Sequence, residues 1–165
     1  MNIIVLSNTY KHPNHTQIIK ALDTNASFNG ANAHTISIQD ANSSHFTQQL
    51  SVNTPDIIIT LDLAGFEFRT LTGECLLNML PCKVCNIIWG DKAEYKDYLS
   101  GKLSLSMLFY DATSQDNQLP AKYPNMRYYY PTSKTILSTT FNDTESEIIE
   151  TLQNIWNHFI AEVQL

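Results

Sequence analysis

The sequence predicts one α/β domain, a three-layer α/β/α sandwich built on a mostly parallel sheet of five to six strands. Short apolar runs alternate with amphipathic helical segments from end to end, which is the order that βαβ units produce. The clearest run, Ile57-Ile58-Ile59, is unbroken, as expected for a strand covered by helices on both faces of a sheet. The chain has 165 residues, 43% of them apolar, which suits a single core over residues 1–165.

The first predicted unit is a strand, a helix and a second strand. Ile3–Leu6 is a short apolar run and predicts the first strand. A helix is expected to begin after Asn14, a capping residue that has Gln17 three positions later. His34–Ile38 alternates polar and apolar residues and predicts the second strand. The apolar face of the helix consists of Ile18, Ile19, Ala21 and Leu22.

The middle of the chain predicts two helices and two strands. Ser44–Val52 predicts a short helix that is stopped by a following proline. Asp56–Leu61 is the strand that contains the isoleucine run. Thr70–Leu80 predicts a helix with its apolar residues on one side, and it too is followed by a proline. Val84–Trp89 predicts the fourth strand.

The next segment predicts a helix and the last two strands. A capping-box pattern at Asp91–Glu94 opens a short helix that we expect to end at Gly101. Leu105–Tyr110 and Met126–Tyr130 predict the fifth and sixth strands. Leu119–Tyr123, between these strands, predicts a turn or a short helix.

The C-terminal helix has the strongest signals. Thr144 can cap it, with Glu147 reaching back to the same turn. Apolar residues follow at helical spacing, and we expect this stripe to face the core. A surface for a protein partner is the alternative. The stripe comprises Ile148, Leu152, Ile155, Trp156, Phe159, Ile160 and Val163.

The composition and the absence of several sequence motifs reduce the number of possible functions. The formal net charge is -6 and the ten Lys and Arg residues form no basic run, so neither nucleic acid nor a membrane surface is an expected partner. No targeting signal or membrane span is recognisable, and we expect a cytoplasmic protein. The five glycines form neither G-x-G-x-x-G nor a P-loop, and no G-x-S-x-G, H-E-x-x-H or paired Cys/His zinc pattern occurs. We therefore expect no metal site, and enzymatic activity is left open.

The three cysteines predict no disulfide framework. Cys82 and Cys85 form a C-x-x-C pair, but the pair follows a helix and enters a strand. A redox pair places its first cysteine at a helix N-terminus, where the thiolate is stabilised. Buried structural thiols are therefore expected.

Candidate ligand-binding residues gather in loops that follow predicted strands, because ligands of open α/β sheets bind beyond the carboxyl ends of the strands. The loop after the first strand combines hydroxyls, two histidines and a helix N-terminus, which suits a phosphate or another anion. Ordinary helix caps use the same residue types and are the alternative. The candidates in this loop are Ser7, Asn8, Thr9, His12, His15 and Thr16.

The loops after the third and fourth strands add carboxylates and an aromatic ring. Asp62 and Glu67 could accept the hydroxyls of a sugar or ribose, or act as a base. Trp89 could stack on a ligand ring, with Asp91 two residues later. The alternatives are an internally bonded Asp62, a core position for Trp89 and a helix-capping role for Asp91.

Four strand patterns follow one another along the chain: Pro55–Thr60, Asn86–Asp91, Leu105–Asp111 and Tyr128–Pro131. This series resembles the N-terminal, Rossmann-like half of GT-B glycosyltransferases, particularly the CgeB-like bacterial group. GT-B enzymes bind the nucleotide-sugar mainly with a second domain, which this sequence does not contain. The resemblance therefore implies a lone half that binds a nucleotide or nucleotide-sugar, or that works with a protein partner or a second copy. It carries over no catalytic residue.

The loop after the first strand is also similar to that of flavodoxin-like and FMN-reductase domains. These domains hold the FMN phosphate with a Ser/Thr-rich loop, and Ser7, Asn8, Thr9 and Thr16 stand in the matching positions. The glycine common in such loops is missing. Three functions thus remain: a ligand- or partner-binding domain, an FMN-binding oxidoreductase, and a protein-interaction module without a ligand.

Overall fold

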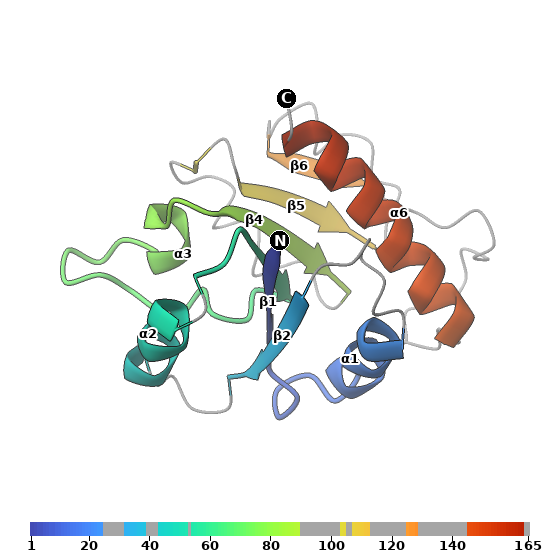
Figure 1. Cartoon of the computed structure of the whole chain (residues 1–165), viewed down its shortest axis with the longest axis horizontal. Helices are drawn as coiled ribbons and strands as arrows, with labels where there is room; N and C mark the ends of the chain where they lie inside the picture. Colours follow the sequence, from blue (N-terminus) through green and yellow to red (C-terminus); the bar gives the residue numbers. More distant parts are fainter. Residues whose placement is uncertain are drawn as a thin grey trace.

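A computed structural model shows a six-stranded parallel sheet with helices on either side (Figure 1). The structure describes residues 1–24, 32–38, 43–52, 54–89, 103–104, 107–112, 125–128 and 145–163. In chain order, the elements are β1 (Asn2–Ser7), α1 (His15–Thr24), β2 (Asn32–Ser37), α2 (Ser43–Val52), β3 (Ile57–Leu61), α3 (Leu76–Met79), β4 (Lys83–Ile88), β5 (Met107–Asp111), β6 (Met126–Tyr128) and α6 (Glu145–Val163).

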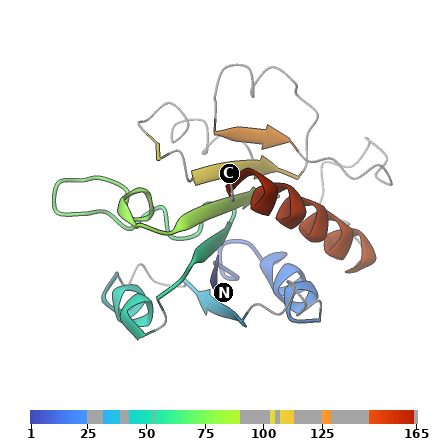
Figure 2. The same cartoon turned by 45° about the horizontal axis from the view of Figure 1, so that its top comes forward.

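The strand order is β2-β1-β3-β4-β5-β6, with β2 at one edge and β6 at the other (Figure 2). The chain leaves β1 outward to β2 and then returns past β1 to β3, so the direction of winding reverses between β1 and β3. This is the flavodoxin-like order 2-1-3-4-5 with one strand added. The reversal creates a switch point at the carboxyl ends of β1 and β3, which is where such sheets bind ligands.

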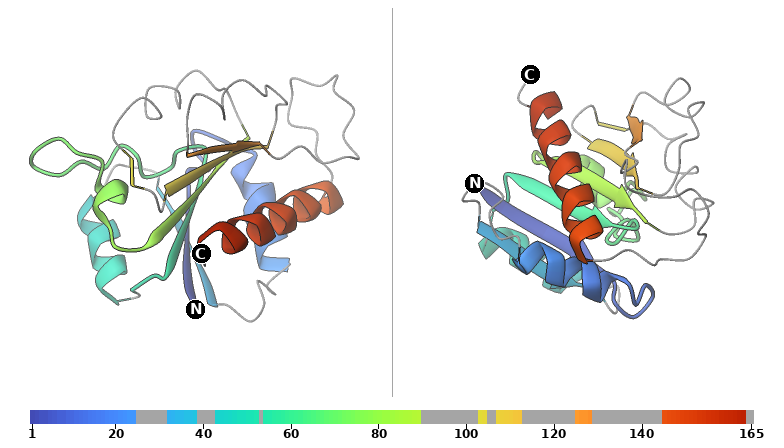
Figure 3. Two further views of the ribbon diagram at one scale, coloured as in Figure 1. Left: turned by 90° about the horizontal axis from the view of Figure 1, so that it is seen from above. Right: turned by 90° about the vertical axis from the view of Figure 1, so that its right-hand side faces the viewer.

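Within the described part of the chain, two helices lie on each face of the sheet. α1 and α6 lie side by side on one face, and α2 and α3 lie on the other (Figure 3). Because successive side chains of a strand point to opposite faces, β1 serves both cores. Ile3 and Val5 belong to the apolar cluster under α1 and α6, whereas Ile4 and Leu6 belong to the cluster on the opposite face. The predicted α/β fold with a parallel sheet is confirmed.

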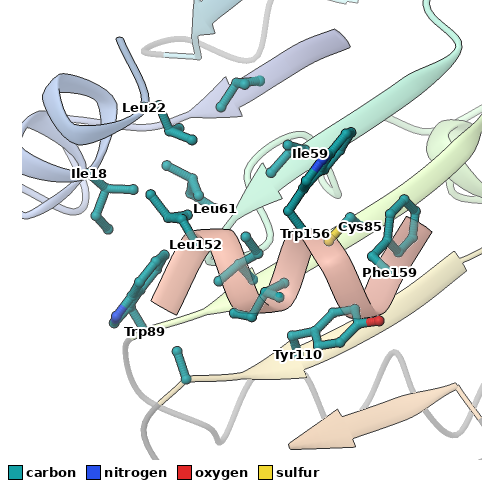
Figure 4. Close-up of a cluster of buried hydrophobic side chains, with 14 of the residues drawn as sticks. Ile18, Leu22, Ile59, Leu61, Cys85, Trp89, Tyr110, Leu152, Trp156 and Phe159 are labelled. Atoms are coloured by element: carbon teal, nitrogen blue, oxygen red, sulfur yellow. The ribbon is translucent and has the colours of Figure 1, made fainter. Parts of the chain in front are cut away.

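The apolar stripe of α6 faces the sheet, as predicted. Trp156 is 5% exposed and Phe159 is fully buried. Both pack in the same cluster as Tyr110 of β5 and Cys85 of β4 (Figure 4). The stripe is therefore core, and it is not available as a partner surface while α6 stays docked.

The helix predicted over Thr70–Leu80 is shorter than expected, because only α3 is helical. The preceding residues form a hairpin-like loop instead, in which the Thr70 N–H donates to the Glu74 carbonyl at 2.8 Å. The Thr70 hydroxyl accepts the Glu74 N–H at 3.1 Å, and Gly73 adopts a φ of 84°. A threonine side chain that bonds a nearby backbone N–H, followed by a glycine in the left-handed region, competes successfully with helix formation.

Other predicted features lie outside the described residues. These include the helix expected from Asp91–Glu94 to Gly101 and the turn at Leu119–Tyr123. Among the residues that are described, no helix is long and apolar enough to cross a membrane.

Two of the three free cysteines are buried, as the sequence predicts for structural thiols. Cys85 lies inside β4 and Cys82 immediately precedes that strand, whereas Cys75 is only half-buried. Burial raises the pKa of the Cys85 thiol strongly. Burial also raises the pKa of the Cys82 thiol, and a backbone hydrogen bond partly offsets the increase.

Stability is expected to fall at alkaline pH because of these thiols. A thiol with a higher pKa in the folded than in the unfolded protein contributes its full stabilisation below the unfolded-state pKa, about 8.5, and loses it as the pH rises above that value. For Cys85 the loss should approach about 1.4 kcal/mol per pH unit. Urea unfolding from about pH 8 to pH 10 should thus show a flatter pH dependence for Cys85→Ala than for the wild type. Equal slopes would contradict this explanation.

Candidate functional site

The turn that follows β1 is closed by its first residue, Asn8. The Asn8 carbonyl accepts the His12 N–H at 2.9 Å, and the Asn8 Oδ1 accepts the Lys11 N–H at 2.9 Å. Asparagine suits this position because its short side chain can bond nearby backbone N–H groups. The two bonds define the Asn8–His12 turn, which forms one wall of the site.

His15, at the start of α1, is fully buried behind this turn. Its Nδ1 accepts the Asn8 backbone N–H at 3.0 Å, and its Nε2 lies 2.8 Å from the Asp62 Oδ2. A backbone N–H can only donate, so Nδ1 must carry its lone pair. The ring is therefore the neutral tautomer in which Nε2–H donates to Asp62.

A second turn, at the end of β3, forms the opposite wall. The Ala64 N–H donates to the Leu61 carbonyl at 3.0 Å, and the two central residues both have positive φ, 47° at Asp62 and 62° at Leu63. This is the type I′ conformation. Residues other than glycine held in a sparsely populated backbone region cost about 1–3 kcal/mol each, and such residues cluster at functional sites.

Hydrogen bonds from the backbone and the side chain hold Asp62 in this conformation. Its N–H donates to the Ile87 carbonyl at 2.9 Å, and its Oδ1 accepts the Trp89 N–H at 2.7 Å. Its Oδ2 accepts from His15. The alternative prediction, an internally bonded Asp62, is thus confirmed, and the carboxylate joins the ends of β1, β3 and β4.

The two turns enclose a cavity of about 240 Å³ at the switch point. Polar side chains from both turns face it, and apolar side chains of the β3 turn complete it. Glu67 is exposed, and its Oε2 also accepts the Gly65 N–H at 3.0 Å. The lining residues are Asn8, Lys11, His12, Asp62, Leu63, Ala64, Phe66 and Glu67.

One cluster of metal-ligating residue types occurs here: His12, His15 and Asp62 each offer an atom within 4.8 Å of the others. Binding a cation through Nε2 of His15 would require a proton on Nδ1. That proton would face the Asn8 N–H, donor against donor. The arrangement therefore does not suit His15 as a ligand through Nε2.

The structure brings four of the predicted site residues together at the cavity: Asn8, His12, Asp62 and Glu67. The other lining residues lie within the two loops that the sequence indicates, Ser7–His12 and Asp62–Glu67, although the sequence does not single them out: Lys11, Leu63, Ala64 and Phe66. No sequence signal predicts the positive φ of Leu63. This φ follows from the hydrogen bonds that close the β3 turn and tie it to β4.

The other predicted residues do not line the cavity. Ser7 is fully buried, and its hydroxyl has no hydrogen-bond partner among the described residues. Thr9 and Thr16 lie elsewhere on the loop and helix, and Thr16 is exposed. Trp89 has a core side chain, as its alternative predicted, and contributes its backbone N–H to Asp62. Asp91 lies outside the described residues.

The expected anion site at the N-terminus of α1 is not supported by the backbone. The N–H groups of His15, Thr16 and Gln17 already donate to carbonyls three residues earlier, at 3.0–3.2 Å. A phosphate would have to displace these bonds, whereas phosphate cradles offer open N–H groups.

No protein-family model matches the chain, and no curated protein or solved structure matches it either.

Proposed function

We propose that this chain is a ligand-binding domain, and that its switch-point cavity holds a small, uncharged, hydroxyl-rich group such as a single sugar unit. The observation that carries the proposal is the lining itself. Lys11 and His12, on the β1 turn, line one cavity together with Asp62 and Glu67 of the β3 turn. Such a mixture of donors and acceptors suits alternating hydroxyl groups, and the half-buried Leu63 offers apolar contact.

The charge balance argues against a phosphate in this cavity. Two carboxylates and one lysine line it, so a doubly negative group would meet more repulsion than attraction. The volume of the cavity indicates a small ligand, because 240 Å³ is below the ~300–1,000 Å³ of pockets that enclose drug-sized ligands. A sugar, or the sugar end of a nucleotide-sugar, is the better fit, which agrees with the first sequence resemblance.

His15 and Asp62 support binding rather than acid–base catalysis. A general base needs a lone pair within reach of the substrate. The Nδ1 of His15 is bonded to the Asn8 N–H, and both carboxylate oxygens of Asp62 accept hydrogen bonds from the protein. Their role in the proposed function is therefore to shape the cavity.

Binding is expected to be weak but measurable. A hexose has about a dozen non-hydrogen atoms, and about -0.3 kcal/mol per atom gives a Kd near 1 mM. Two-dimensional NMR titrations with glucose, galactose and N-acetylglucosamine should shift the amides of both turns, and inorganic phosphate should not. Glu67→Gln should weaken binding about tenfold, since it removes a charged acceptor. Glu74→Gln, an exposed control outside the cavity lining, should leave the affinity unchanged.

No shift with any sugar, or equal effects of the two Glu→Gln variants, would overturn the proposal. A nucleotide-sugar that binds much more tightly than its free sugar would extend the site beyond the cavity and support the glycosyltransferase-half interpretation.

An FMN-binding oxidoreductase is the second candidate, favoured by the flavodoxin-like strand order. Two observations argue against FMN binding. The first N–H groups of α1 already donate to carbonyls, and a single lysine lines the cavity. Adding FMN to the purified protein tests this candidate. A red-shifted flavin spectrum with quenched fluorescence would favour FMN binding over sugar binding.

A further inference from the structure

We propose that His15 is a positioning residue for the cavity, and that its neutral, Nε2-protonated ring sets the place of the Asn8–His12 turn. His15 is not a lining residue and is fully buried, so it does not touch a ligand in the cavity. It acts through Asn8, which does line the cavity. The expected effect on ligand binding rests on the proposed function, whereas the expected effect on the position of the turn does not.

The ring is held in place on three sides. The His12 ring stacks on it, with the centroids 4.9 Å apart and the planes 26° apart. Nδ1 bonds the Asn8 N–H, and Nε2–H bonds the Asp62 carboxylate. A residue with one acceptor and one donor on opposite ring edges therefore joins the turn of β1 to the turn of β3, the two walls of the cavity.

The two hydrogen bonds of the ring, called here the Nδ1 arm and the Nε2 arm, have separate consequences. The Nδ1 arm holds the Asn8 backbone, and Asn8 then fixes Lys11 and His12 through its own two bonds. The Nε2 arm supplies one of the hydrogen bonds of Asp62, and those with Ile87 and Trp89 remain if this one is lost. Loss of the Nδ1 arm should therefore misplace the wall, whereas loss of the Nε2 arm should mainly leave a buried carboxylate oxygen unsatisfied.

Two substitutions separate the arms. His15→Asn places Oδ1 where Nδ1 was, so it retains the acceptor for Asn8 and loses the donor to Asp62. His15→Gln places its terminal NH₂ where Nε2–H was, so it retains the donor and loses the acceptor. A residue with a merely structural role would respond to both changes alike.

The first readout needs no ligand. Amide hydrogen exchange of Asn8 should stay slow in His15→Asn and speed up about tenfold or more in His15→Gln, because the lost hydrogen bond is what protects it. The Ile59 amide in β3 reports global opening and corrects for any loss of stability. The ¹⁵N resonance of Nδ1 in the wild type should lie in the range of an unprotonated ring nitrogen.

The second readout is sugar binding. His15→Asn should retain affinity within about threefold, and His15→Gln should lose about tenfold, although His15→Gln is the variant that keeps the bond to Asp62. Equal Asn8 protection in the two variants, or a protonated Nδ1, would overturn the inference. If the exchange pattern holds and the wild type binds no sugar, the proposed function fails while the positioning of the turn by His15 stands.

Discussion

Replacing Asp62 with alanine is expected to lower the free energy of unfolding by about 3–5 kcal/mol. The carboxylate accepts hydrogen bonds from the His15 ring and from the Trp89 backbone, and both donors lie in buried residues. Removing it would leave two buried donors without acceptors. Alanine would also have to adopt the φ of 47°, which aspartate tolerates better.

Asp56 provides a control for this substitution. Its carboxylate also accepts a backbone N–H, from Asn2 at 2.7 Å, but the bond is exposed at the opposite end of β1 and β3. Asp56→Ala should therefore cost about 1 kcal/mol or less. Urea denaturation of both variants measures the difference. Similar losses would mean that the Asp62 bonds matter no more than an ordinary surface bond.

Asp62→Asn gives a finer test of the histidine tautomer. An asparagine has one acceptor oxygen, so its NH₂ must face either the Trp89 N–H or Nε2 of His15. Turning the tautomer to accept at Nε2 would place Nδ1–H against the Asn8 N–H. The isosteric change is therefore expected to cost about 2–3 kcal/mol, since one donor conflict remains in every arrangement.

Gly65→Ala is expected to cost about 2–4 kcal/mol, the second large effect. Gly65 has a φ of 92°, and an added Cβ would lie 2.9 Å from Cδ1 of Leu6. Leu6 is fully buried in β1 and cannot move aside without disturbing the core on the α2 and α3 face. The substitution therefore combines backbone strain with a steric clash directly beneath the β3 turn.

Gly73→Ala separates these two contributions. Gly73 has a similar φ of 84°, but no atom lies within 4 Å of the added Cβ. Its cost should be the backbone strain alone, about 1 kcal/mol. Thermal unfolding of both variants should therefore show a larger loss for Gly65→Ala. If the two losses are equal, Leu6 relaxes freely and the turn is less tightly packed than its geometry indicates.

Much of the fold could be predicted because its signals are local. The isoleucine run of β3 indicates a strand buried on both faces, and the apolar stripe of α6 indicates which side of that helix is buried. The clearest failure is also local, since Thr70 and Gly73 divert a segment with helical spacing into a hairpin-like loop. There the hydrogen bonds of one threonine side chain outweigh the apolar pattern.

The site was predicted less well, because its roles depend on distant partners. His12 and His15 are the same residue type three positions apart, yet one lines the cavity and the other is buried behind it. The difference arises from Asp62, 47 residues beyond His15 in the sequence. The sequence selected both loops correctly and could not assign these roles.

The sequence by itself determined the alternation of strands and helices, the parallel sheet, and the loops in which a site should be sought, since these depend on periodicity and on residues close together in the chain. Only the tertiary structure decided the strand order that places the ends of β1 and β3 side by side. It also decided the tautomer of His15 and the left-handed turn at Asp62 and Leu63. The physical reason is that strand pairing and buried hydrogen bonds join residues far apart in the chain, and their energies are settled only when the partners meet.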